Sequence, residues 1–100
     1  MKIKVLCNDK ARFSEIRRVA VDKDPGAEVS GGAWHVEELH TFIDGSGPDV
    51  LVIDEAVPEN LGPIEALALK RPDIDILLIS HETSAEFLRQ AMRAGVREVL

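Results

Sequence analysis

Two short apolar runs, at residues 50–53 and 76–79, place the strongest limit on how this chain can fold. They read Val50-Leu51-Val52-Ile53 and Ile76-Leu77-Leu78-Ile79. Neither run alternates between apolar and polar residues, which is typical of central parallel strands covered by helices on both faces. The two runs therefore predict an α/β fold around a buried parallel sheet.

Strand-like and helix-like segments alternate along the rest of the chain. Further strands are expected at residues 3–7, 27–30 and 96–100. Four helices are expected from apolar residues at helical spacing: Phe13, Ile16, Val19 and Ala20 on one face of the first, Val36, Leu39 and Ile43 turned inward in the second, Ile64, Leu67 and Ala68 buried in the third, and Phe87, Leu88, Ala91 and Met92 in the fourth. Pro63 is expected near the start of the third helix, and Thr83 or Ser84 is expected to cap the fourth. The order predicts one domain over residues 1–100 with a doubly wound, five-stranded parallel sheet.

Charge and composition exclude several classes of function. The net charge is -6 over 100 residues, so the surface should repel nucleic acid and anionic membranes. No apolar run approaches the roughly 20 residues of a membrane helix, and a cytoplasmic setting is expected. Cys7 is the only cysteine and is expected to be a small core residue of the first strand. The chain has no nucleotide-binding loop, and its three histidines lack metal-ligand spacing.

Polar side chains follow three of the predicted strands. Asn8 and Asp9 come after the first strand, Asp54 after the third, and Ser80 after the fourth. In open α/β sheets, ligands bind outside the carboxyl ends of the central strands. This edge of the sheet is therefore the candidate site.

The chain resembles the receiver domains of response regulators. The resemblance rests on Asp54 in Val52-Ile53-Asp54-Glu55-Ala56-Val57-Pro58, on Ser80, and on the segment Ala94-Gly95-Val96-Arg97-Glu98-Val99-Leu100. It implies a flavodoxin-like strand order 2-1-3-4-5, with the last helix missing or outside the chain. It also implies that Asp54 is the phosphoacceptor and Ser80 the hydroxyl switch position. Any Mg²⁺ would be bound by Asp9, Asp54 and the carbonyl of Ala56, with Asn8 in the outer shell.

Three positions depart from the receiver pattern. Asn8 replaces one carboxylate of the acidic pair, His81 stands where a small residue is usual, and Val99 occupies the position of the aromatic switch. These changes favour a receiver fold kept as a scaffold, with no cofactor required. The alternative is a working phosphoacceptor domain of two-component signalling in which Asp54 is phosphorylated.

The run Gln90-Ala91-Met92-Arg93-Ala94-Gly95-Val96-Arg97-Glu98 carries a narrower resemblance. It is similar to the amino-terminal receiver-like domain of TadZ/CpaE pilus assembly proteins. The resemblance implies a longer protein in which an ATPase domain follows this one. It also implies a role in assembling type IVb (Flp/Tad) pili, contacts with other pilus assembly and secretion proteins, and a location at a cell pole. The domain itself would be a non-enzymatic module for localisation and self-association.

A surface near the carboxyl terminus is the candidate interface. Without a fifth helix, one face of the last two predicted strands lacks a cover, and such exposed apolar patches usually mark an interface. We expect a homodimer formed through Phe87, Leu88, Ala91, Met92, Val96 and Val99. Trp34 remains open between packing over a helix start and forming an exposed recognition tip.

Overall fold

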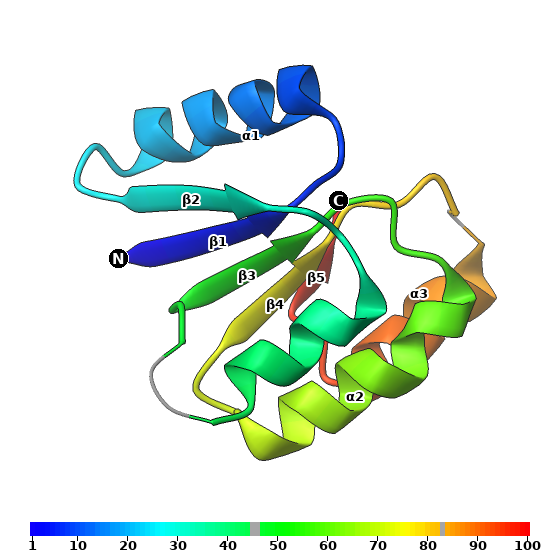
Figure 1. The fold of residues 1–100 in the computed structure, drawn as a ribbon. Helices are drawn as coiled ribbons and strands as arrows, with labels where there is room; N and C mark the ends of the chain where they lie inside the picture. The colour runs from blue at the N-terminus through cyan, green and yellow to red at the C-terminus, as the bar shows by residue number, and fades with distance from the viewer. Residues whose placement is uncertain (45–46, 83) are drawn as a thin grey trace.

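The computed structural model describes residues 1–44, 47–82 and 84–100, which fold around a parallel sheet of five strands (Figure 1). The strands are β1 (Lys2–Leu6), β2 (Glu28–Gly32), β3 (Val50–Ile53), β4 (Asp75–Leu78) and β5 (Glu98–Val99). Every neighbouring pair is parallel, and the order is β2-β1-β3-β4-β5. The predicted fold class and strand order are therefore confirmed.

Helices cover the two faces of the sheet unequally. One face carries α1 (Lys10–Lys23), which lies over β1 and β2 (Figure 1). The opposite face carries the 3-10 helix η1 (Val36–Phe42), α2 (Leu61–Lys70) and α3 (Ala85–Arg93), with the short 3-10 turn η2 (Pro58–Asn60) leading into α2. Each face has its own apolar cluster, because side chains of successive strand residues point to opposite sides of the sheet. The larger cluster lies under η1, α2 and α3.

Two helix predictions need correction. The second predicted helix is a 3-10 helix, in which the amide of Glu38 donates to the carbonyl of His35 at 2.9 Å. Val19 was expected on the apolar face of the first helix but is 53% exposed. Phe13, Ile16 and Ala20 pack against the sheet, whereas Val19 does not belong to this contact.

The start of α3 agrees with one of the two predicted caps. The hydroxyl of Ser84 accepts the amide of Phe87 at 3.1 Å, which satisfies one of the free amides of the first turn. Thr83, the other predicted cap, lies outside the described residues. No helix in the described part of the chain is both long enough and apolar enough to span a bilayer.

Candidate functional site

The carboxyl ends of the central strands meet at one edge, and backbone hydrogen bonds continue past the assigned strands. The amide of Asp54 donates to the carbonyl of Leu6 at 3.0 Å, and the amide of Ile79 donates to Ile53 at 2.9 Å. Since Leu6 pairs with Ile53, the next residue of each strand, Cys7 and Asp54, reaches the same level. The register therefore places Cys7 beside Asp54.

Asp54 is buried, with only 2% of its surface exposed. Its Oδ2 accepts a hydrogen bond from the Cys7 thiol at 3.2 Å and forms an ion pair with Nε of Arg12 at 3.0 Å. Its Oδ1 is also buried and has no hydrogen-bond partner among the described residues. One carboxylate oxygen is thus held by two donors, and the other is closed off from solvent.

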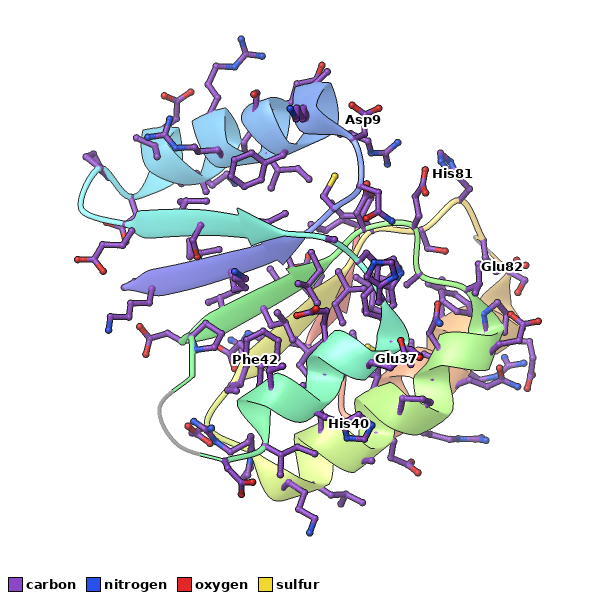
Figure 2. All side chains as sticks on the ribbon, in the orientation of Figure 1. Asp9, Glu37, His40, Phe42, His81 and Glu82 are labelled. Carbon is purple, nitrogen blue, oxygen red and sulfur yellow. The ribbon has the colours of Figure 1, made fainter. Side chains whose placement is uncertain are left out.

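Asp9 lies at the start of α1 and caps this helix. Its Oδ1 accepts the amides of Ala11 at 2.9 Å and Arg12 at 3.2 Å, so it is the N-cap of α1. Figure 2 shows Asp9 at the start of α1, on the same edge as His81. Because Asp9 begins the helix, Arg12 falls in the first turn and reaches Asp54. Arg12 therefore supplies a positive charge at Asp54, where the prediction had Mg²⁺.

Asn8 is bound to the segment that follows β2. Its Oδ1 accepts the amide of Trp34 at 2.8 Å, and its Nδ2 donates to the carbonyl of Trp34 at 3.3 Å. The Trp34 side chain is half-buried and packs against the larger core cluster. The structure therefore favours the packing interpretation of Trp34. Asn8 links the end of β1 to the segment after β2 through both of these hydrogen bonds.

Ser80 is turned toward a backbone carbonyl. Its hydroxyl donates to the carbonyl of Ala56 at 2.6 Å and accepts the amide of Glu82 at 3.1 Å. The chain turns sharply after Asp54, where Glu55 has φ of 52°, a left-handed conformation that is uncommon for residues other than glycine. The turn brings Ala56 to the end of β4, where its amide donates to Ile79 at 3.1 Å. Both predicted partners, Ser80 and the carbonyl of Ala56, thus bind each other.

The predicted Mg²⁺ site does not fit these contacts. Mg²⁺ prefers several oxygen ligands in a near-octahedral arrangement. Here Asp9 caps α1, the carbonyl of Ala56 accepts Ser80, and Asp54 is paired with the guanidinium of Arg12. Cys7, a soft thiol, donates to the same oxygen of Asp54 that Arg12 binds, and the described residues contain no cluster of three potential metal ligands among His, Cys, Asp and Glu. These contacts disfavour Mg²⁺ at Asp9, Asp54 and Ala56, and the metal assignment stays a prediction.

Arg12 and Cys7 are the two contacts of Asp54 that the sequence interpretation missed. Cys7 was assigned to the core, and it is half-buried against the apolar cluster of Ile3 and Val5, one residue beyond the end of β1. Its place could have been found by extending the pairing of Leu6 with Ile53 by one residue. Arg12 could have been found from its position three residues after the N-cap, on the first turn of the helix.

The residues predicted for the interface fall into a buried group and an exposed group. Phe87, Ala91 and Val96 are no more than 3% exposed and belong to the core, so they are not available to a partner. Val99 is half-buried against the same core cluster. Leu88 and Met92 are 39% and 55% exposed, and as residues i and i+4 of α3 they lie on one face. Of the residues predicted for the interface, Leu88 and Met92 are the ones that are exposed.

The pKa of the Cys7 thiol is raised, and besides burial the charge of Asp54 is one of the causes. Burial raises the pKa of Cys7, and the hydrogen bond to Asp54 and the negative charge of Asp54 raise it further. The carbonyl of Asp9 and the guanidinium of Arg12 act in the opposite direction. At neutral pH, Cys7 is therefore a protonated donor to Asp54.

Asp54→Asn is expected to lower the pKa of Cys7. The substitution removes a negative charge that disfavours the thiolate, so deprotonation should begin at lower pH. Thiolate absorbance measured against pH gives the midpoint directly, since Cys7 is the only cysteine. Asp75→Asn, at an exposed position on β4, is the matched control and should leave the midpoint unchanged. An Asp54→Asn midpoint at or above that of the unaltered chain would contradict the contact.

Comparison with known proteins gives the family. No family model matches the chain. A solved pilus assembly-related protein from Burkholderia pseudomallei is 31% identical, with a TM-score of 0.86 over 100% of this chain and 76% of that one. A solved pilus assembly protein, cpaE, from Burkholderia thailandensis is 30% identical, with a TM-score of 0.84 over 100% of this chain and 84% of that one. The chain belongs to the CpaE family of pilus assembly proteins.

This CpaE-family chain is also similar to response regulators. The transcriptional activator DevR/DosR of Mycobacterium tuberculosis is 35% identical over 86 residues, which cover 80% of this chain and 39% of that protein. A solved response regulator with 20% identity shares the fold. The chain spans 28% to 43% of the length of the curated relatives it matches. The predicted family and its receiver-like fold are confirmed.

Proposed function

We propose that this chain is a non-enzymatic receiver-like module that makes protein–protein contacts within a Flp/Tad pilus assembly protein. The observation that carries the proposal is the state of Asp54, which is buried, paired with Arg12 and hydrogen-bonded by Cys7. A phosphoacceptor carboxylate must present a free oxygen to phosphorus in line with the leaving group. Neither oxygen of Asp54 is presented in this way, which favours the scaffold over the phosphorylated alternative.

The pilus role is supported by family membership. Two solved relatives at 30% and 31% identity are described as pilus assembly proteins, and both align with the whole of this chain. The proposal includes a following ATPase domain, contacts with other pilus assembly proteins, and a cytoplasmic location close to the pilus apparatus. It includes no nucleic acid partner, because the net charge of -6 disfavours one.

A second copy of this chain is the proposed partner of α3. This helix carries three different stripes of side chains. Phe87 and Ala91 are buried, the charged stripe is paired internally through Arg89 and Glu86 at 2.9 Å, and Leu88 and Met92 are exposed. Since the charged stripe has its own partners, the apolar stripe is the part of α3 that gains most from burial.

Leu88→Asp and Met92→Asp are each expected to weaken self-association by at least about tenfold. A carboxylate placed in a desolvated apolar contact costs more than the roughly 1.4 kcal/mol that corresponds to a tenfold change. Sedimentation velocity over a series of protein concentrations measures the dissociation constant. Leu69→Asp is the matched control, because Leu69 is 78% exposed on α2 and lies outside the proposed interface. A strict monomer at high micromolar concentration would contradict the homodimer.

A further inference from the structure

Asp54 carries a charge that the fold must balance. Its side chain is 3% exposed, and an ionised carboxylate at such a depth is stable only when it is paired or hydrogen-bonded. Among the described residues, the cation on Asp54 is Arg12, whose Nε lies 3.0 Å from Oδ2. The second donor, the Cys7 thiol, is neutral and adds no positive charge. The charge of the carboxylate is therefore balanced by Arg12.

The position of Arg12 is fixed by the helix cap of α1 and by the partial burial of its side chain. Asp9 caps α1 by accepting the amides of Ala11 and Arg12, so the backbone of Arg12 is fixed within the first helical turn. The side chain is only 30% exposed, although arginine usually keeps its charged end in water. Capping and partial burial together direct the guanidinium toward the end of β3.

We propose that the guanidinium of Arg12 is the resident cation at Asp54 and keeps divalent cations away from this carboxylate. A divalent cation at Asp54 would have to displace Arg12 or tolerate its positive charge at close range. It would also find few ligands, because Cys7 presents a thiol, the amide of Asn8 is already bound to Trp34, and Oδ1 of Asp9 already accepts two amides of α1. The surroundings of Asp54 in this way disfavour the metal ion that phosphoryl transfer to a carboxylate needs.

The contact between Arg12 and Asp54 is expected to be strongly coupled. Only Oδ2 is engaged, while Oδ1 is buried without a partner among the described residues. Loss of Arg12 would leave a buried carboxylate with the neutral thiol as its remaining donor. The cost of losing Arg12 should consequently depend on whether residue 54 carries a charge.

A double-mutant cycle tests this coupling. We expect Arg12→Met to lower the folding equilibrium constant by about 30-fold at pH 7.5, because methionine keeps part of the packing but none of the charge. In the Asp54→Asn background the same substitution should lower the constant by about threefold or less. Urea unfolding followed by circular dichroism measures both values. Arg18→Met, at an exposed position of α1, is the matched control and should have an equal, small effect in both backgrounds.

Two outcomes would overturn the proposal. One is an equal loss on Arg12→Met with Asp54 or Asn at position 54, which would show that the guanidinium does not balance the carboxylate. If Arg12→Met alone does not fold, the double variant is expected to fold with a stability close to that of Asp54→Asn, since the loss then depends on the charge at residue 54; a double variant that also fails to fold would contradict the proposal.

The other outcome concerns the unaltered chain and depends on no variant that might be unstable. At constant ionic strength, replacing Na⁺ by millimolar Mg²⁺ should leave its urea midpoint unchanged. A rise in the midpoint that Asp54→Asn abolishes would show that Asp54 binds a divalent cation although the chain carries Arg12. This result concerns Asp54 alone, and the proposed self-association through α3 is tested separately.

Discussion

Phe87→Ala is expected to lower the free energy of unfolding by about 3–5 kcal/mol. Phe87 is 2% exposed and belongs to the main core cluster beneath α3. Truncation to alanine removes its apolar contacts and leaves a cavity that the packed neighbours cannot fully close. Total stability for a domain of this size is about 5–15 kcal/mol, so the loss is a large part of the whole.

Urea unfolding of Phe87→Ala and Leu88→Ala tests this assignment of the two faces of α3. Leu88 is the neighbouring residue but is 39% exposed, and its truncation should cost about 1 kcal/mol or less in the monomer. In self-association the order should reverse, with Leu88 the more important of the two. Similar losses of stability for both variants would show that α3 does not present the faces described here.

Gly95→Ala is expected to lower the free energy of unfolding by about 2–4 kcal/mol, for two separate reasons. Gly95 has φ of 96°, which residues with a Cβ rarely adopt. An added Cβ would also lie 2.8 Å from the Cβ of Ala68 on α2, so it could not be accommodated without moving the backbone. The turn after α3 would shift, and with it Val96, which is 3% exposed.

Gly62→Ala is the matched control for Gly95→Ala. Gly62 lies within α2, where an added Cβ meets no atom within 4 Å. This substitution should be neutral or stabilise the chain by up to about 1 kcal/mol, because alanine restricts the unfolded chain and favours helix. Chemical unfolding of both variants gives the comparison. If Gly95→Ala were as harmless as Gly62→Ala, the tight approach of the turn to α2 would be wrong.

The fold could be predicted from the sequence because its main signals are local. Buried parallel strands give continuous apolar runs, and β3 agrees with the expected residues 50–53. The start of α1 after Asp9 likewise follows from capping chemistry. Local signals failed at Val19, which follows the apolar pattern of the first helix but is 53% exposed, while Phe13, Ile16 and Ala20 pack on the sheet.

The contacts of the site could be predicted only in part, because they depend on the direction of each side chain. Asp54 and Ser80 were placed at the correct edge, since strand ends define that edge. The cap contacts of Asp9 follow from its place beside two free amides of a helix start, while its predicted part in a metal site stays a prediction. The contact of Cys7 with Asp54 was missed because sheet register, rather than sequence neighbourhood, brings it there.

The family resemblance at residues 90–98 has a physical basis in the structure. Ala91, Ala94 and Val96 in this run are buried, and Gly95 provides the positive φ that ends α3. These residues are needed for packing and for the turn, whereas Met92 is exposed. Sequence likeness in this run therefore reports mainly on the fold, and the proposed role of α3 in self-association rests on the exposed residues.

The proposed scaffold role requires that Asp54 stay in its internal ion pair and not act as a phosphoacceptor. The most direct measurement is intact mass after incubation with Mg²⁺ and acetyl phosphate, with Asp54→Asn treated in parallel. We predict no gain in mass for the unaltered chain, because both oxygens of Asp54 are enclosed and Oδ2 is held by Arg12 and Cys7. A stoichiometric gain of one phosphoryl group, absent in Asp54→Asn, would contradict the claim.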